Sequence, residues 1–153
     1  MSWKGKYEHT QRGTLIIGTV SAAILLILAT GYISGPEWIT IIVLGIMVFV
    51  LTIMSTLTIS LMGGILRIRF GPVGLFRKNW PVAEIVSVTE VTNPWYYGYG
   101  LRWTPDGRLY NVSGRGAVEI LMFSGEKFRI GSDEPDILVK AILSAMEQKH
   151  APS

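Results

Sequence analysis

Cysteine is absent from the chain of 153 residues. The chain therefore has no disulfide, no thiolate ligand for zinc or an iron–sulfur cluster, and no cysteine nucleophile. Histidine is scarce, and both copies, His9 and His150, lie near the chain ends. An imidazole in a tail is not held within hydrogen-bond reach of a substrate, so we expect neither to act as a general base. The sequence thus predicts no enzymatic activity, no catalytic residue, no metal site and no cofactor.

Charge is nearly absent from one long stretch, in which Glu37 is the only formal charge between Thr14 and Leu61. A break at Ser34-Gly35-Pro36-Glu37 divides it into two apolar halves, 14–33 and 38–55. Each half approaches the roughly 20 residues with which a helix crosses a ~30 Å hydrocarbon core. The stretch predicts a transmembrane helical hairpin over residues 14–55. A cleaved signal peptide is the alternative for the first half, but its apolar run is longer than such segments and a second run follows.

The flanks of this hairpin are basic, whereas its connecting loop carries only Glu37. The flanking cations are Lys4, Lys6, Arg12, Arg67, Arg69, Arg77 and Lys78. Cytoplasmic flanks of membrane spans carry an excess of Lys and Arg, so we expect a multi-pass protein of the cell inner (plasma) membrane with both termini in the cytoplasm. Neither half contains an ionisable residue inside the span, which argues against a channel or a transporter.

The remainder predicts one small domain. Polar and apolar residues alternate over 56–70 around Gly63-Gly64, which favours a β-hairpin; a second helix continuing to Met62 is the alternative. Further short alternating runs and a helix after Pro135 complete an α+β fold of about seven antiparallel strands, in a sheet or barrel closed by an amphipathic C-terminal helix. We therefore divide the chain into a cytoplasmic tail (1–13), the membrane hairpin (14–55), the β domain with its helix (56–149) and a tail (150–153).

Motifs for anion or nucleic-acid chemistry are weak. Gly98-Tyr99-Gly100 and Gly114-Arg115-Gly116 do not stand between a strand and a helix, so they do not predict a nucleotide site. The acidic residues Asp133, Glu134 and Asp136 fall in a first helical turn, where the helix dipole favours them. A net charge of +3 without a basic stripe argues against nucleic-acid binding.

The most unusual feature of the soluble part is the aromatic run Trp95 to Trp103, which includes Arg102. We expect Tyr97, Tyr99 and Trp103 to belong to the core. Trp95 and Tyr96 precede the strand and are least needed there. Trp, Tyr and Arg are enriched where interfaces concentrate their binding energy, so Trp95, Tyr96 and Arg102 are candidate interface residues.

Three segments carry a resemblance to a family. They are Gly98-Tyr99-Gly100-Leu101-Arg102, Tyr110-Asn111-Val112-Ser113-Gly114-Arg115-Gly116-Ala117-Val118-Glu119 and Arg129-Ile130-Gly131-Ser132-Asp133-Glu134-Pro135. With them the chain resembles bacterial PH-like (pleckstrin-homology-like) membrane proteins, which are mostly of unknown function. The resemblance implies two N-terminal transmembrane helices followed by a PH-like sheet and a closing helix.

Eukaryotic PH domains that bind phosphoinositides use a basic loop between their first two strands, where this sequence has Met62-Gly63-Gly64. A specific inositol-phosphate pocket is therefore not expected. The basic residues of the strands that follow, Arg67, Arg69, Arg77 and Lys78, are candidates for contact with anionic lipid.

Two functional hypotheses remain. The first is a membrane-anchored interaction or scaffold module on the cytoplasmic face of a bacterial inner membrane, which binds a protein partner or another copy of itself and contacts anionic lipid weakly. The alternative is an enzyme or small-ligand-binding protein whose site the sequence does not reveal.

Overall fold

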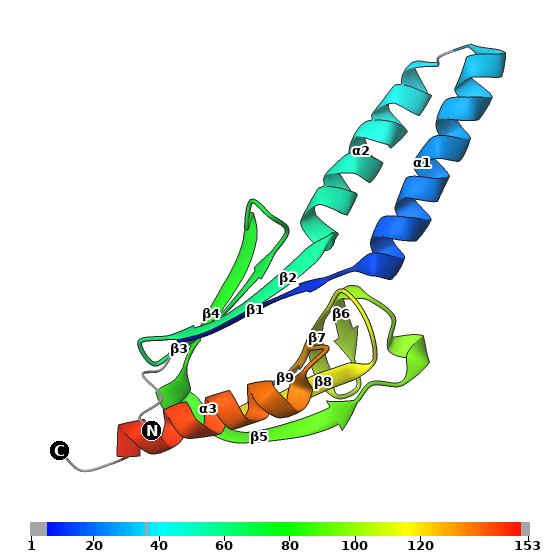
Figure 1. The fold of residues 1–153 in the computed structure, drawn as a ribbon. Coiled ribbons are helices and arrows are strands. Elements are labelled where there is room, and N and C mark those ends of the chain that lie inside the picture. Colours follow the sequence, from blue (N-terminus) through cyan, green and yellow to red (C-terminus); the bar gives the residue numbers. More distant parts are fainter. Residues whose placement is uncertain (1–5, 36, 151–153) are drawn as a thin grey trace.

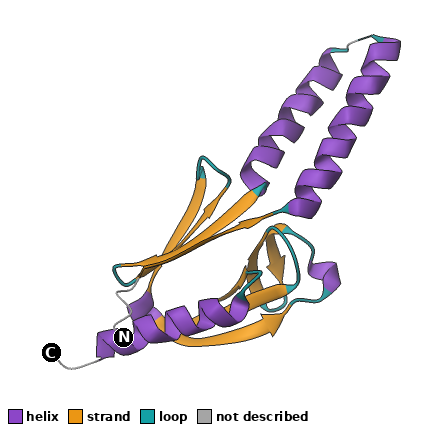
Figure 2. Cartoon of the chain, viewed as in Figure 1, coloured by secondary structure: helices purple, strands orange, loops and turns teal. Residues whose placement is uncertain are grey.

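A computed structural model describes residues 6–35 and 37–150. Within them the chain is α+β, with three α-helices and nine strands in two sheets (Figure 1, Figure 2). Residues 1–5 and 151–153, which belong to the two predicted tails, lie outside this part. The strands are β1 (Lys6–Arg12), β2 (Thr56–Met62), β3 (Ile65–Phe70), β4 (Phe76–Pro81), β5 (Ile85–Thr92), β6 (Gly100–Thr104), β7 (Gly107–Asn111), β8 (Gly116–Met122) and β9 (Lys127–Gly131). The helices are α1 (Thr14–Ser34), α2 (Trp38–Met54) and α3 (Pro135–His150), with 3-10 turns η1 (Val82–Glu84) and η2 (Trp95–Tyr97).

Helices α1 and α2 lie side by side and project away from the sheets (Figure 1). Neither buries a residue. The 21 residues of α1 span about 32 Å at the α-helical rise, whereas the 17 residues of α2 span about 26 Å, less than a ~30 Å hydrocarbon core. Among the described helices α1 alone is long and apolar enough to cross a membrane by length and composition. The sequence predicts two such spans; the second is short because α2 ends at Met54 and a strand follows.

The described part of the N-terminal segment is largely a strand, whereas the sequence predicts a tail over residues 1–13. Residues 6–12 form β1 and pair antiparallel with β2 from Lys6↔Met62 to Arg12↔Thr56. The partner of β1 lies beyond both helices in the sequence, so the residues around β1 give no sign of this pairing. The connection between the first two strands is therefore the α1–α2 hairpin, whereas Met62-Gly63-Gly64 joins β2 to β3.

Backbone hydrogen bonds hold the ends of the helical hairpin on this sheet. Gly13 N donates to Ser55 O (2.8 Å), so the start of α1 is tied to the end of α2. Gly71 N donates to Thr56 O (2.9 Å), which brings the turn between β3 and β4 to the same place. The end of the first sheet nearest α1 and α2 thus consists of Arg12, Thr56 and this turn.

The first sheet has the order β1-β2-β3-β4 and is antiparallel, which confirms the hairpin predicted over residues 56–70. The second sheet has the order β5-β8-β9-β7-β6. Here β7 and β9 run parallel, so the prediction of purely antiparallel strands is wrong at this pair. The reason is that the β6–β7 hairpin is inserted between β5 and β8 and joins the sheet at β9.

The core lies between the two sheets and beneath α3. Its aromatic centre stacks Trp80 on Phe128 with ring centroids 4.2 Å apart, and Tyr110 meets Trp80 edge-on at 5.6 Å. Leu138 and Ile142 of α3 are fully buried in the same core. Helix α3 packs against β5, β8 and η1 and closes the domain, as predicted of the C-terminal helix.

Candidate functional site

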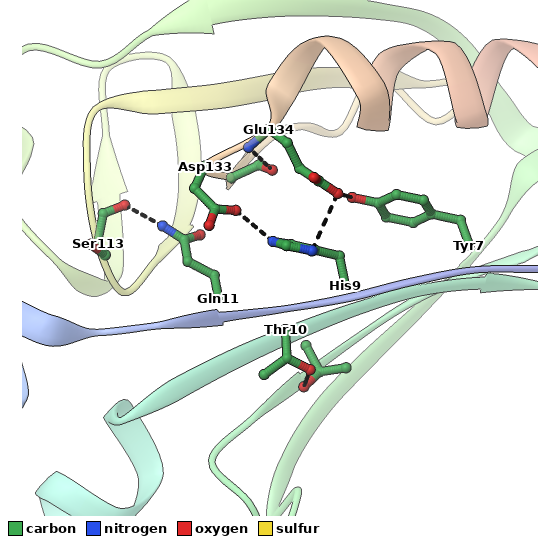
Figure 3. A network of polar contacts seen from close by, with 9 residues as sticks. Tyr7, His9, Thr10, Gln11, Ser113, Asp133 and Glu134 are labelled. Atoms are coloured by element: carbon green, nitrogen blue, oxygen red, sulfur yellow. Dashed lines mark hydrogen bonds and ion pairs between the residues drawn. The ribbon is translucent and has the colours of Figure 1, made fainter.

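Four polar side chains join β1 to the start of α3 (Figure 3). His9 Nε2 lies 2.6 Å from Asp133 Oδ1, and His9 Nδ1 lies 3.3 Å from Glu134 Oε1. Tyr7 donates its hydroxyl to the same Glu134 oxygen at 2.7 Å. Burial, and after it the Glu134 carboxylate, raises the pKa of Tyr7, so its hydroxyl remains a donor. We call Tyr7, His9, Asp133 and Glu134 the clasp.

The clasp corrects the placement of His9 in a tail, and its geometry indicates a structural role. Ionised carboxylates only accept hydrogen bonds, and each nitrogen of His9 faces one, so neither nitrogen is left for a substrate. Of the acidic residues predicted for a first helical turn, Asp136 lies in the first turn of α3, whereas Asp133 and Glu134 directly precede the helix, where Ser132 Oγ accepts a bond from Glu134 N (3.1 Å). Their contact with β1 could not be read from the sequence, because the pairs are separated by nearly the whole chain.

The four predicted lipid-contact residues do not share one face. Burial alternates along β3 and β4, so Arg67, Arg69 and Arg77 point outward, whereas half-buried Lys78 lies on the opposite face, across from buried Ile68. Arg69 and Arg77 are direct cross-strand neighbours. None of the four forms an ion pair with any residue in the described part of the chain.

The turn between β3 and β4 is apolar and exposed beside α2. Val73 and Leu75 are 71% and 62% exposed. Gly71 anchors the turn with a φ of 74°, and a Cβ atom there would lie 2.6 Å from Thr52 O of α2. Glycine is therefore required at this close approach to the membrane-hairpin candidate.

The aromatic residues Trp95, Tyr96 and Tyr97 form η2, which we call the aromatic loop. Trp95 and Tyr96 are 80% and 66% exposed, and each packs edge-on against the next ring. The expectation of a core role is wrong for Trp103, which is 77% exposed, because β6 is the edge strand of its sheet. Tyr97 and Tyr99 are half-buried and are not members of the core.

Arg129 of β9 holds the base of the aromatic loop. Its guanidinium contacts Glu119 Oε2 (2.9 Å), Asp106 Oδ2 (3.1 Å) and Asn93 Oδ1 (3.1 Å). Tyr97 donates its hydroxyl to Asp106 Oδ2 at 2.6 Å. That bond lowers the pKa of Asp106 and raises the pKa of Tyr97, so the acceptor stays ionised and the donor protonated. The sequence gives no signal for this cluster, because its members come from four separate segments.

Arg102 does not join Trp95 and Tyr96. It donates from Nε to Tyr99 O (2.9 Å) and lines a groove of about 330 Å³ between β4 and the β6–β7 hairpin. The lining residues are Phe76, Lys78, Leu101, Arg102, Trp103, Arg108 and Tyr110, and we call this set the groove. The Arg108 guanidinium lies over the Trp103 ring, 4.3 Å from its centroid. Three cations and two partly exposed aromatic rings thus converge at one edge of the domain.

Within residues 6–35 and 37–150 the structure contains no cluster of three or more His, Asp or Glu side chains that could hold a metal ion.

Replacement of Tyr7 by phenylalanine tests the clasp. It removes one partly buried hydrogen bond to a carboxylate and should lower the free energy of unfolding by about 1–2 kcal/mol, measured by denaturant titration. Glu8→Gln is the matched control, because Glu8 is the exposed neighbour of Tyr7 and makes no ion pair in the described part of the chain. Equal decreases in the free energy of unfolding in the two variants would show that the Tyr7 hydrogen bond of the clasp adds no stability.

Comparisons of the chain with protein-family models and with curated protein sequences find no match.

Proposed function

We propose that this chain is a membrane-anchored, non-enzymatic interaction module on the cytoplasmic face of a bacterial inner membrane. It binds a protein partner or a second copy of itself and contacts anionic lipid weakly. We also propose that its domain is PH-like. Support for this comes from the strand count, since leaving out the inserted β6–β7 hairpin leaves seven strands and a closing helix.

The main support for this proposal is that the aromatic loop exposes two large aromatic side chains on a well-supported segment. Trp95 and Tyr96 expose 80% and 66% of their surface, yet their neighbours are held in place: Arg129 bonds to the Asn93 side chain, and Tyr97 bonds to Asp106. A rigid support lowers the conformational entropy lost on binding, and large aromatic residues supply most of the energy at interface hot spots. An exposed, preorganised aromatic pair therefore suits a protein-binding surface.

The anchor in this proposal is the α1–α2 hairpin, with both helices crossing the bilayer. Both are apolar throughout and bury no residue in the rest of the chain. Helix α2 is somewhat short, and local thinning of the bilayer accommodates such a mismatch at modest cost. The two helices return the chain to the side on which it started, and Arg12, Arg69 and Arg77 near their bases favour the cytoplasm.

Lipid contact is proposed for the turn between β3 and β4 and for Arg69 and Arg77. These two arginines stand two residues from the Arg12–Thr56 pair, about 7 Å along the strands, which places them within a Debye length of the hairpin base. Val73 and Leu75 extend from the same end of the sheet. Each basic residue near an anionic surface contributes about 1 kcal/mol.

Single cysteines test the topology without background, since the chain has none of its own. In spheroplasts an impermeant maleimide should label Ser34→Cys, at the tip of the hairpin, and should label Ser124→Cys, in the exposed β8–β9 turn, only after lysis. If α1 alone crosses the membrane, both positions lie on one side and label together. Labelling of Ser124→Cys alone would reverse the proposed orientation.

An environment-sensitive fluorophore tests the lipid contact. In nanodiscs that contain anionic lipid, a label on Leu75→Cys should emit at shorter wavelength than the same label on Phe123→Cys. Both side chains are exposed, but Phe123 lies at the far end of the domain, where its backbone N bonds to Glu84 O of η1. The combined Arg69→Gln and Arg77→Gln change should reduce the shift at residue 75. Identical emission from the two positions would refute the contact.

Replacement of Trp95 and Tyr96 by alanine tests the interface. Because both side chains are exposed, thermal unfolding should stay nearly unchanged, while crosslinked complexes in native membranes should fall severalfold. Phe123→Ala is the control for loss of an exposed aromatic residue elsewhere. Unchanged crosslinking in the double variant would remove the interface from the proposal.

A further inference from the structure

The groove lies where two free strand edges meet. Strand β4 is an edge of the first sheet and β6 an edge of the second. On the other side of the domain, α3 packs on edge strand β5, and the clasp ties its start to edge strand β1. Within the described residues no strand pairs with the outer edge of β4 or of β6. Both edges therefore keep a row of backbone donors and acceptors available.

The groove contains three cationic side chains, one of which is a lysine that faces inward. Lys78 occupies an inward position on β4, next to buried Trp80 on the same face and opposite buried Ile68. Arg108 is half-buried on β7, and Arg102 completes the set. None of the three forms an ion pair with a described residue, and no acidic side chain lines the groove. An inward lysine beside two arginines favours an occupant that brings negative charge.

Apolar surface accompanies this charge. Leu101 and Trp103 expose 47% and 77% of their surface on the edge strand, and half-buried Phe76 faces them from β4. A small anion would use the cations but would leave the apolar side chains and the carbonyl groups of the strand edge unmatched. An extended peptide matches all of these features, because its backbone pairs with a strand edge and its alternate side chains lie on opposite faces.

We propose that the groove binds an extended acidic segment of a protein partner, which pairs with the free edge of β6 and directs its carboxylates to Lys78 and Arg108. This inference rests on the proposed function and names the chemistry of the partner. The aromatic loop immediately precedes β6, so one partner can contact both surfaces.

The test measures binding of a fluorescent acetyl-(Glu-Val)3-amide peptide to the full chain in nanodiscs of neutral lipid. Fluorescence anisotropy should report binding of this peptide and none of its (Lys-Val)3 counterpart. Lys78→Gln and Arg108→Gln should each raise the dissociation constant about tenfold, because each removes a charge-assisted contact. Arg77→Gln is the matched control: residue 77 is the neighbour of Lys78 on β4 but faces the opposite side, so binding should be unchanged.

Two further measurements address the strand pairing. A (Glu-Pro)3 peptide keeps the charge but lacks alternate amide hydrogens, and it should bind much more weakly. The (Glu-Val)3 peptide should also slow amide hydrogen exchange in residues 100–104 and leave the edge strand 85–92 unaffected. Equal binding of the proline peptide, or equal loss in Arg77→Gln and Lys78→Gln, would overturn the proposal.

Other occupants are separate outcomes of the same assay. Displacement of the peptide by millimolar inorganic phosphate would show a simple anion site, and displacement by anionic but not neutral vesicles would show a lipid site; either result contradicts the proposal. If the peptide fails to bind while crosslinking still depends on Trp95 and Tyr96, the groove assignment fails alone. If the peptide binds while the Trp95 and Tyr96 replacements leave crosslinking unaffected, the assignment of the groove is supported and that of the aromatic loop as an interface fails.

Discussion

The pairing of β1 with β2 is the contact on which the rest of the structure depends. Its register runs without a break from Lys6↔Met62 to Arg12↔Thr56, and the Gly13–Ser55 hydrogen bond continues it to the first turn of α1. The helical hairpin is therefore an extension of a β-ribbon, not a separate anchor on a loose linker. Orientation of the two helices in a membrane would orient the first sheet as well, because little flexible chain lies between them.

The surfaces of the domain follow from this arrangement. Arg69, Arg77 and the β3–β4 turn lie at the helix end of the first sheet, and the clasp holds α3 across the edge strand β1. The groove stays open because α3 covers the opposite side and the inserted β6–β7 hairpin brings Trp103 and Arg108 close to β4. Arg129 then supports the aromatic loop from the outer face of the second sheet.

Local patterns were sufficient to predict the elements whose partners are close in sequence. The break at Ser34–Glu37, the β2–β3 hairpin and α3 all belong to this group, because charge, period-two alternation and helix-start residues act over a few positions. Strand β1 could not be predicted this way, since the helices separate it from β2. The clasp and the Arg129 cluster depend on pairs far apart in sequence. The inward position of Lys78 could have been predicted from the sequence. Lys78 is two residues from both Phe76 and Trp80, and alternate residues of a strand lie on the same face. Trp103 was misjudged because alternation identifies a face but not an edge strand.

The insertion of α1 and α2 between two paired strands has a consequence for how the chain is assembled. In the proposed membrane anchor, the α1–α2 hairpin forms in the bilayer while the rest of the chain is still being synthesised, and its two ends then lie side by side. The entropic cost of closing a long loop is thereby met before β2 exists, and β1–β2 pairing becomes an almost local event. The clasp requires Asp133 and Glu134, which follow all nine described strands in the chain, so it can lock β1 to the domain only after those strands have been made. A ribosome-bound chain that lacks α3 would carry a paired first sheet with its core still open.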